Sequence, residues 1–407
     1  MNKAELKDLK ALLQGHLPEE NTVRNHSRAG GNNLQDVLSG NYLAAGEVFK
    51  ISSSYPYDMT IGKRKLRCYR IPEIVHKYSG SGKLELGDIV FLDTETTGLG
   101  TGSGTFVFLV GLGYFTEKDF TVDQYLLDRL SGEQHFLESI ISEISSYCGI
   151  VTFNGKSFDM PLLRNRFIFN GLTAELPDLW HLDLLHLTRR LWQNSLSGYD
   201  LQNIEQQVLG FWRNPGEDIP GEKIPEVYRN YLQDRDASFL KNIVLHNRTD
   251  ILSLVILLDL IAELITGDIR DCFEWKFRDE SGIGKLFEQM RDEVNAIRCF
   301  ERSIRIFDDD RVSLKRLSFL LKKRGEVSRA EKLWEKAAAC DEIYAMVELA
   351  KLEEHQRKNY VKALEWTLRA HNLLQQRAMV NSGNFQSLIK RSNRLQQKLN
   401  RDKIEDD

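Results

Sequence analysis

Two carboxylates, Asp93 and Glu95, stand two positions apart at the end of a short apolar segment that begins at Ile89. The segment is rich in β-branched and aromatic residues and lies between Gly87 and Gly98, which predicts a β-strand. Because side chains alternate faces along a strand, both carboxylates are expected to point to the same side. Ordinary strand-end charges facing water would also explain them. If the pair is buried, it requires a cation, and Mg²⁺ or Mn²⁺ with oxygen ligands is the simplest one.

Two further acidic residues occupy comparable positions. Asp159 follows a second short apolar run and opens an expected helix whose first turn contains Pro161. Its carboxylate could equally serve as the N-cap of that helix. Asp250 lies four residues after His246, on a long apolar helix expected to continue to about Ile265, so both side chains share one helix face. The plain alternative for this second pair is an ion pair on the helix surface.

These acidic residues are expected to meet in one place. In open α/β sheets the ends of strands gather in one crevice. Asp93, Glu95, Asp159 and Asp250 would repel each other strongly there unless cations were present. Two divalent cations, Mg²⁺ or Mn²⁺, about 3.5–4 Å apart would satisfy them and form a site for in-line phosphoryl displacement. His246, whose ordinary pKa lies near neutrality, is then the candidate general base that takes a proton from the attacking water.

Three segments, in order, resemble the exonuclease motifs of the DEDD superfamily: Asp93–Leu99, Asn154–Asp159 and His246–Asp250. More narrowly, they resemble the YprB family of bacteria, which joins such a domain to tetratricopeptide-like helices. The resemblance runs from about residue 86 to residue 265, and the tail agrees with it. It implies an α/β ribonuclease H-like domain, with a mixed central sheet and flanking helices. It also implies hydrolytic removal of nucleotides from a 3′ end of DNA or RNA, with a single-stranded end as the expected partner.

The resemblance also implies roles for individual residues. Asp93 and Glu95 would hold both ions, with Asp93 bridging them. Asp159 would bind the more loosely held ion, and Asp250 would complete the other. The third motif departs from the patterns of the superfamily, which have either His four residues before the Asp or Tyr three residues before it. His246 occupies the place of the Tyr but carries the side chain of the other pattern, which leaves its role as a base open.

Several other polar residues are candidates for substrate contact. The motif residues Thr96, Asn154 and Phe158 are expected to contact the nucleic acid. The glycine-rich stretch Gly100–Gly104 is interpreted first as a turn and second as a phosphate cradle; it does not match a Walker loop. The basic run Lys63–Arg67 would suit either a phosphate backbone or a solvated strand face.

The elements that must position these residues follow from periodicity. Further strands are expected at 105–115 and about 120–127, and helices at about 134–147, 181–192 and 200–209. The segment 181–192 contains two histidines five positions apart, which is poor spacing for a shared metal on a helix. We treat them as structural or close to the substrate: His181 and His186.

Composition narrows the class of protein. The chain has 407 residues, with 42% hydrophobic and 28% charged residues and a net charge of −4, which gives no overall signature of nucleic-acid binding. The longest apolar-rich stretch, Ile251–Ile265, contains Asp259 and Glu263 and is too short for a membrane span of roughly 18 to 20 residues. Five cysteines without a Cys-x-x-Cys pair argue against a zinc ribbon or a disulfide framework. With no apolar core of a signal peptide near Met1, a cytoplasmic protein without a membrane partner is expected.

The chain is expected to contain four parts. Residues 1–80 would form an N-terminal helix over about 1–17 followed by a poorly defined segment, and residues 81–270 the ribonuclease H-like domain. Residues 280–380 would form tetratricopeptide-like repeats, and residues 381–407 a polar helix.

The expected repeat is a small residue followed by a large aromatic one at a period of 33–34 residues. It is carried by Ala296–Phe300, Ala330–Trp334 and Ala363–Trp366, with the tryptophan displaced by one position in the third copy. A plain array of helical hairpins is the alternative. A repeat array would present a concave face, expected to be basic and to bind nucleic acid or a protein partner. The basic residues assigned to it are Arg298, Arg302, Arg305, Lys315, Arg316, Lys322, Lys323 and Arg324.

Together these expectations describe a metal-dependent nuclease, a 3′–5′ exonuclease in its main interpretation. Two alternatives stay open. One is a nucleic-acid-binding or scaffold protein with weak or no catalysis that acts through its repeats, and the other is a structure-specific endonuclease on the same metal core.

Overall fold

The computed structural model describes most of the chain, in two compact units. The sheet unit comprises residues 1–189 and 196–272, and the helical unit residues 190–195 and 273–407. The described residues are 33–43, 48–66, 71, 75, 84–98, 104–172, 179–193, 196–214, 216–266, 279–377 and 383–405. The helix expected over residues 1–17 and most of the glycine-rich stretch, residues 100–103, lie outside them.

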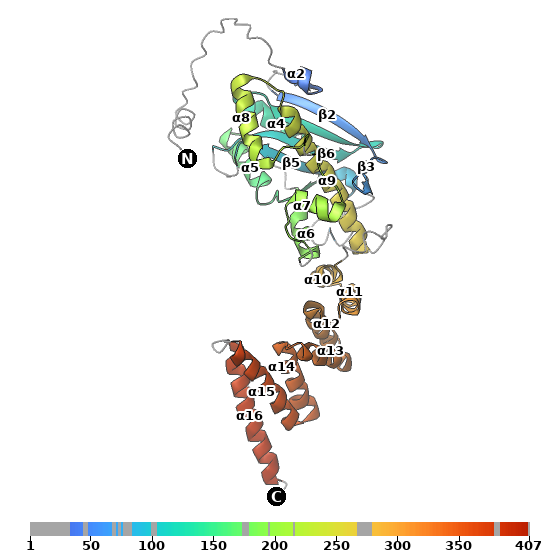
Figure 1. Ribbon diagram of the computed structural model, residues 1–407, viewed down its shortest axis with the longest axis vertical. Helices are drawn as coiled ribbons and strands as arrows, with labels where there is room; N and C mark the ends of the chain where they lie inside the picture. The colour runs from blue at the N-terminus through green and yellow to red at the C-terminus, as the bar shows by residue number, and fades with distance from the viewer. Residues whose placement is uncertain are drawn as a thin grey trace. The chain divides into compact units, whose positions relative to one another are not determined.

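A seven-stranded sheet in the order β1-β2-β7-β6-β5-β8-β9 forms the centre of the sheet unit (Figure 1). β8 pairs in parallel with both β5 and β9, and the other neighbours pair antiparallel, which confirms the mixed sheet expected from the sequence. The strands are β1 (Gly40–Tyr42), β2 (Val48–Pro56), β5 (Ile89–Thr96), β6 (Val107–Phe115), β7 (Asp119–Leu127), β8 (Gly149–Thr152) and β9 (Trp180–Asp183). A separate two-stranded hairpin consists of β3 (Thr60–Ile61) and β4 (Arg64–Lys65).

Helices cover the sheet and supply two of the three motifs. The described helices of this unit are α2 (Leu34–Val37), α4 (Glu133–Ile144), α5 (Asp159–Phe169), α6 (Leu184–Leu191), α7 (Leu201–Ile204), α8 (Ile224–Asp234) and α9 (Leu240–Thr266). The long helix α9 packs on β5, β6 and β7. Asp93 of β5 contacts α9 and the next residue, Thr94, contacts α5, so these two helices approach β5 from different sides.

Two glycines of β6 let α9 lie close to the sheet. A Cβ atom on Gly111 would lie 2.3 Å from Oδ1 of Asn247, and one on Gly113 would lie 2.4 Å from Cγ2 of Ile251. Both distances are far shorter than a van der Waals contact, so only glycine allows this approach. The close packing brings the third motif, which α9 carries, next to Asp93.

The structure departs from the sequence interpretation in two places. Residues 48–56, expected to lie in a poorly defined segment, form β2, which pairs with the whole of β7 from Val48↔Leu127 to Pro56↔Asp119. The first part of the expected helix 181–192 is β9, because Trp180–Asp183 pair with β8, and α6 begins only at Leu184. Pairing with distant strands, which periodicity does not report, decides both cases.

The helical unit contains seven consecutive described helices, which bears out the all-α region. They are α10 (Glu280–Gln289), α11 (Glu293–Ile306), α12 (Arg311–Lys323), α13 (Val327–Ala339), α14 (Ile343–Leu352), α15 (Tyr360–Gln376) and α16 (Gly383–Glu405). Each packs against the next along the chain. The small and aromatic residues Ala296, Phe300, Ala330, Trp334 and Ala363 are all buried. This burial agrees with the expected period, while a tetratricopeptide identity stays a prediction.

The basic face expected on the helical unit is not uniformly positive. Five of its eight basic side chains pair with acidic ones: Arg302 with Glu280, Arg316 with Glu288, Lys322 with Glu348, Lys323 with Glu293, and Arg324 with Glu326. Paired charges of opposite sign cancel at a distance, so the attraction for phosphates is weaker than the sequence suggests.

The last helix, α16, is attached through one buried carboxylate. Glu354 lies in a single π-helical turn, Glu353–Arg357, that continues α14. It accepts hydrogen bonds from Arg391 at 2.7 Å, Arg394 at 2.8 and 3.0 Å, and Lys398 at 2.9 Å, all on α16. The polar C-terminal helix therefore docks by charge as well as by the buried Leu388 and Leu395.

Every helix in the described part of the chain is either too short or too polar to span a bilayer.

Candidate active site

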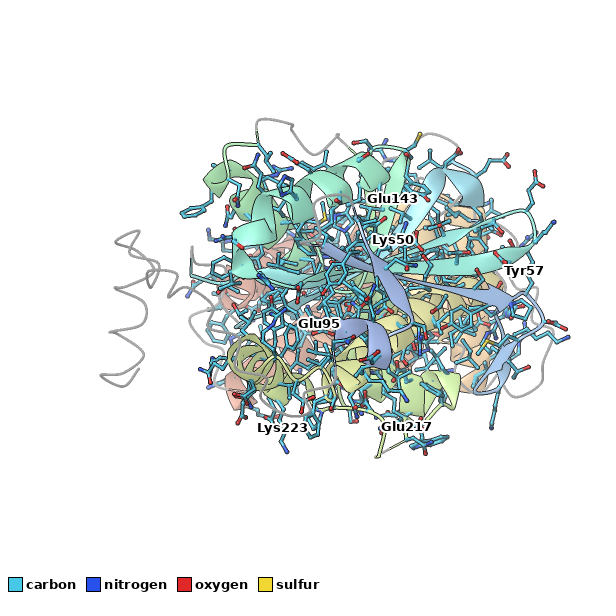
Figure 2. All side chains as sticks on the ribbon, turned by 90° about the horizontal axis from the view of Figure 1, so that it is seen from above. Lys50, Tyr57, Glu95, Glu143, Glu217 and Lys223 are labelled. Atoms are coloured by element: carbon cyan, nitrogen blue, oxygen red, sulfur yellow. The ribbon has the colours of Figure 1, made fainter. Side chains whose placement is uncertain are left out.

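β5 presents two of the predicted acidic residues on one side. Asp93 and Glu95 are half-buried, whereas Thr94 and Thr96 between and beyond them are buried. This alternation is the one expected for a strand. Glu95 lies toward the middle of the view in Figure 2, and Glu217 and Lys223 lie at its lower margin.

Asp93 is held by a chain of amides that the sequence interpretation missed. Nδ2 of Asn247, on α9, donates to Oδ2 of Asp93 at 2.8 Å and to its backbone oxygen at 3.1 Å. Nε2 of Gln124, on β7, donates in turn to Oδ1 of Asn247 at 2.8 Å. Asn247 is fully buried, and it follows His246 directly on a largely apolar helix. A buried amide in such a helix requires polar partners, and that requirement was the available signal.

Asp159 reaches the same region from the start of α5. β8 leaves β5 after the pair Phe91↔Val151, and α5 begins seven residues after β8 ends, alongside the end of β5. Asp159 accepts a hydrogen bond from the hydroxyl of Thr94. The N-cap position belongs to Phe158, so Asp159 is not the cap that the sequence left open.

Asp183, a residue that sequence analysis did not single out, braces the turn before Asp159. Its buried carboxylate accepts from the backbone N–H groups of Asn154 at 2.8 Å, Lys156 at 3.1 Å and Leu185 at 3.0 Å. Asn154 has a positive φ of 64°, a conformation that asparagine tolerates better than most residues. The end of β9 therefore fixes the path of the chain from β8 into α5.

The third motif lies on one face of α9, as expected for residues four apart. Nε2 of His246 lies 3.7 Å from Oδ2 of Asp250. Nδ1 of His246 lies 2.8 Å from Oδ1 of Asp218, which belongs to the loop before α8. Asp218 therefore faces one ring nitrogen of His246 and Asp250 faces the other, and only Asp250 was anticipated.

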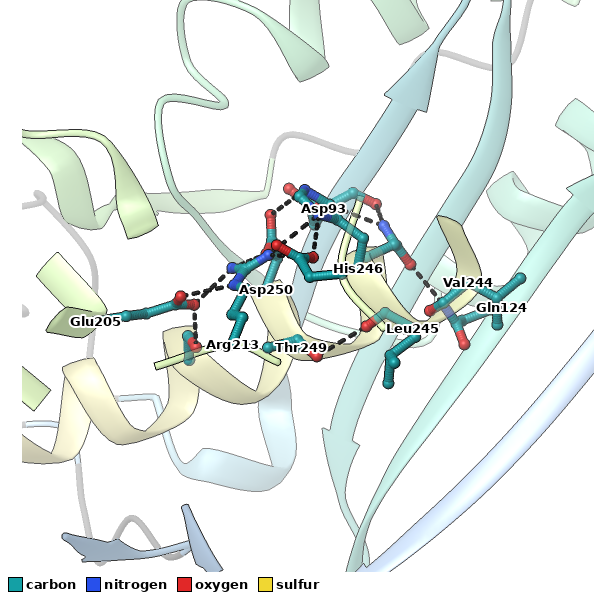
Figure 3. A network of polar contacts seen from close by, with 12 residues as sticks. Asp93, Gln124, Glu205, Arg213, Val244, Leu245, His246, Thr249 and Asp250 are labelled. Atoms are coloured by element: carbon teal, nitrogen blue, oxygen red, sulfur yellow. Dashed lines mark hydrogen bonds and ion pairs between the residues drawn. The ribbon is translucent and has the colours of Figure 1, made fainter. Parts of the chain in front are cut away.

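An arginine that sequence analysis did not single out links these groups. Arg213 donates to Oε2 and Oε1 of Glu205 at 2.7 and 2.6 Å, to Oδ1 of Asp218 at 3.4 Å, and also to Asp250. Glu205 is fully buried and accepts as well from the hydroxyl of Ser253 at 2.6 Å. Arg213 thus ties the loop after α7 to α9 at the position of Asp250 (Figure 3).

Crowding of like charges perturbs the acidic groups. The pKa of Asp93 is raised well above its usual value by burial and by the nearby charges of Asp250, Glu95 and Asp159. Burial raises the pKa of Glu95 to about 8, with His246 opposing and Asp250 and Asp159 adding to the shift. The pKa of Asp159 rises to about 6, mainly by burial. The four predicted carboxylates therefore interact in one place.

The donors suit a hard divalent cation, since clustered carboxylate oxygens that repel one another are the ligands such ions take. Among the described residues, however, no group of three or more His, Cys, Asp or Glu side chains is already arranged around one ion. Asp159 accepts from Thr94, and Asp250 accepts from Arg213. In each case one carboxylate oxygen accepts this bond, and the second oxygen of the same side chain can still ligate an ion.

The expected substrate contacts occupy different surroundings. The hydroxyl of Thr96 is buried and donates to the backbone oxygen of Gly98 at 2.7 Å, so it stabilises a turn. Asn154 is exposed and Phe158 is half-buried, both in the turn before Asp159. These two remain accessible to a strand of nucleic acid, whereas the hydroxyl of Thr96 is already engaged.

The two histidines of the segment 181–192 contact residues at the ends of β8 and β9. Nε2 of His181 lies 2.8 Å from the hydroxyl oxygen of Thr152, and burial lowers the pKa of His181 to about 4. His186 is exposed on α6, with Nε2 4.0 Å from Oδ2 of Asp183. His181 therefore has the structural surroundings that the sequence left as one of two options.

Comparison with known proteins agrees with this geometry. The RNase H superfamily profile matches residues 90–262, which contain all four carboxylates and His246. The uncharacterized protein YprB of Bacillus subtilis (strain 168) is 33% identical over 296 residues, which cover 71% of this chain and 70% of that protein. The superfamily as a whole acts on nucleic acids and generally hydrolyses phosphodiesters, typically with divalent metal ions. The chain belongs to the family of YprB and carries a ribonuclease H-like domain.

Proposed function

We propose that this protein is a metal-dependent exonuclease that removes nucleotides from the 3′ end of DNA or RNA. The observation that supports it most is the meeting of Asp93, Glu95, Asp159 and Asp250, four carboxylates from three distant segments whose charges help to raise the pKa of Asp93 and of Glu95. Such a cluster costs free energy of folding unless cations compensate it. A superfamily domain that hydrolyses phosphodiesters supplies the matching chemistry.

Each residue has a stated part in this proposal. Asp93 and Glu95 would hold two divalent ions, Mg²⁺ or Mn²⁺, with Asp159 and Asp250 completing them. When bound, these ions would supply a polarised water and charge neutralisation at the phosphorus. Bound cations would offset the charges of Asp250 and Glu95 that raise the pKa of His246, and the neutral ring would then receive the proton of the attacking water at Nε2, because Nδ1 faces Asp218. Asn247 would keep the Asp93 carboxylate in place through its hydrogen bond.

The direct test uses the full chain with Mg²⁺ or Mn²⁺ and single strands labelled at the 3′ or the 5′ end. We expect stepwise shortening from the 3′ end by the parent protein, and loss of at least about a hundredfold in rate for Asp93→Ala, since a shared ligand of both ions is removed. Glu217→Gln, an exposed acidic residue of the loop before α8, is the matched control. Equal rates for parent and Asp93→Ala would refute the assignment, and cleavage of circular substrates would show an endonuclease instead.

One observation favours a second candidate, a nucleic-acid-binding or scaffold protein without turnover. Arg213 already neutralises Asp250, as a cation would. If that ion pair is permanent, the cluster has less need of ions. Calorimetry with Mn²⁺ separates the two: binding that Asp159→Ala weakens supports the nuclease, and no binding supports the scaffold.

A further inference from the structure

An exposed tryptophan stands at the rim of the candidate active site. Trp212 is 66% exposed, although tryptophan is a largely buried residue in most proteins. The next residue, Arg213, has a side chain only 5% exposed and donates to Asp250. Because consecutive Cα atoms lie about 3.8 Å apart, the indole begins beside a residue that contacts the acidic cluster. The chain thus directs Arg213 inward and leaves the indole in solvent.

A lysine from a distant segment lies on the same rim. The turn of the β3–β4 hairpin packs on the segment before Trp212: a Cβ atom on Gly62 would lie 3.0 Å from the backbone oxygen of Leu209, and one on Gly210 would lie 3.4 Å from Cδ of Lys63. Lys63 itself is exposed. It belongs to the basic run for which sequence analysis offered a phosphate backbone or a solvated strand face.

The position of the hairpin sets its distance from the cluster. Arg64, next to Lys63, pairs with Asp259 of α9 at 2.8 Å. Asp259 follows Asp250 by nine residues, about 13–14 Å along a helix axis. A nucleic-acid strand of a few nucleotides covers that distance.

A nucleic-acid strand beside the cluster requires attractive contacts outside it, because the cluster is negatively charged. The cluster and its neighbours Glu205, Asp218 and Asp183 are acidic and repel phosphates. A cation and an aromatic face beside it would supply the attraction. Aromatic side chains bind single strands because every unpaired base has an open face for stacking, whereas duplex bases are already stacked on each other.

We propose that Trp212 and Lys63 form a binding subsite for single-stranded nucleic acid beside the carboxylate cluster. The indole stacks on an unpaired base, and the ammonium group of Lys63 binds a backbone phosphate. The role of this subsite in holding a substrate rests on the proposed function, but binding of a single strand does not require hydrolysis.

The test measures binding of the full chain, in EDTA, by fluorescence anisotropy of a labelled oligothymidylate and of a blunt duplex. Trp212→Ala should weaken binding of the single strand by about five- to a hundredfold, the range of base–aromatic stacking, while Trp212→Phe keeps most of it. Lys63→Gln should reduce the slope of log affinity against log salt by about 0.7, the value for one phosphate of a single strand. Circular dichroism checks that each variant is folded.

Two matched variants serve as controls. Phe239→Ala removes an aromatic residue of similar exposure, 68%, immediately before the first residue of α9, and Lys118→Gln removes an exposed lysine of the β6–β7 turn. Neither should change the affinity. The proposal is overturned if Trp212→Ala binds single strands as tightly as the parent, if it weakens duplex binding equally, or if the parent binds no single strand.

The outcomes also separate this inference from the proposed function. Weakened binding by Trp212→Ala, without hydrolysis by the parent under any metal, would retain the subsite and remove the nuclease. Hydrolysis by the parent, with normal binding by Trp212→Ala, would retain the nuclease and remove the subsite.

Discussion

His246 faces an acidic residue through each of its two ring nitrogens. Asp218 lies 2.8 Å from Nδ1, and Asp250 lies 3.7 Å from Nε2. The closer contact fixes the ring plane and leaves Nε2 toward the cluster. The unusual spacing of the third motif therefore does not leave the imidazole of His246 without orientation, because Asp218, a residue outside the motif, orients the ring.

The first prediction concerns the charge of His246 in protein without metal. Burial alone would lower the pKa of His246, but the hydrogen bond to Asp218 and the charges of Asp250 and Glu95 raise it to about 9. Asp218→Asn removes the strongest of these opposing contributions and should lower the pKa. Titration of the imidazole followed by NMR in EDTA measures the change, and Glu217→Gln, one residue away and exposed, is the control. An unchanged titration in Asp218→Asn would show that Asp218 does not act on the ring.

The sequence predicted some residues of the candidate site and missed others. The spacing within each motif placed Asp93, Glu95, Asp159 and Asp250 on elements that the structure brings together. The second set of groups, Asn247, Asp218, Arg213, Glu205 and Asp183, was missed. Their contacts join residues up to 154 positions apart, as Asn247 and Asp93 do, and nothing in a local pattern records such a contact. Only the cost of a buried polar group points to them, and burial is itself a result of folding.

Among elements, α9 has the greatest effect on the site, because it carries His246, Asn247 and Asp250 and lies directly on β6. Periodicity identified this helix well, since its long apolar run contains few breaks. It identified β9 badly, since a four-residue strand flanked by an amphipathic helix has the same composition as the helix. The glycines of β6 lay within an expected strand and were assigned no role, yet they set the distance between the helix and the sheet.

The second prediction tests that distance. Gly111→Ala would place a methyl group 2.3 Å from Oδ1 of Asn247 and 2.4 Å from Cδ1 of Ile251, so α9 must shift. We expect a loss of about 1–3 kcal/mol in the free energy of unfolding, as overpacked cores show. Urea unfolding measures it. Gly87→Ala is the control, because no atom lies within 4 Å of its added Cβ. Equal stability of the two variants would mean that α9 does not depend on the glycine.

At the scale of the whole molecule, the two units depend on different forces. The sheet unit has a large apolar core, whereas the last helix of the helical unit is held in part by a carboxylate that four basic side chains surround. Low pH should therefore weaken the docking of α16, whereas the apolar core of the sheet unit does not depend on this carboxylate.

The third prediction gives the pH range. Burial alone would raise the pKa of Glu354, but hydrogen bonds from Arg394 and Lys398 lower it to about 2. Since the pKa is depressed in the folded state, the stabilisation is complete above the ordinary value of 4.5 and is lost as the pH falls from there toward 2. The protection of α16 amides against hydrogen exchange, measured relative to the intrinsic exchange rate at each pH, should fall across this range, and Glu354→Gln should show low protection already at pH 7. Glu365→Gln, exposed on α15, is the control; slow exchange in Glu354→Gln would contradict the prediction.

The hairpin that carries Arg64 has a consequence for where the ribonuclease H-like domain can be truncated. Residues 90–262 include Asp259 but neither Arg64 nor β2. A polypeptide trimmed to this range would leave Asp259 without its guanidinium partner at 2.8 Å. It would also bare the edge of β7 along its full length, a surface prone to intermolecular pairing. We therefore expect a polypeptide of residues 90–262 to be less stable and more prone to self-association than a chain that also includes β2 and the β3–β4 hairpin.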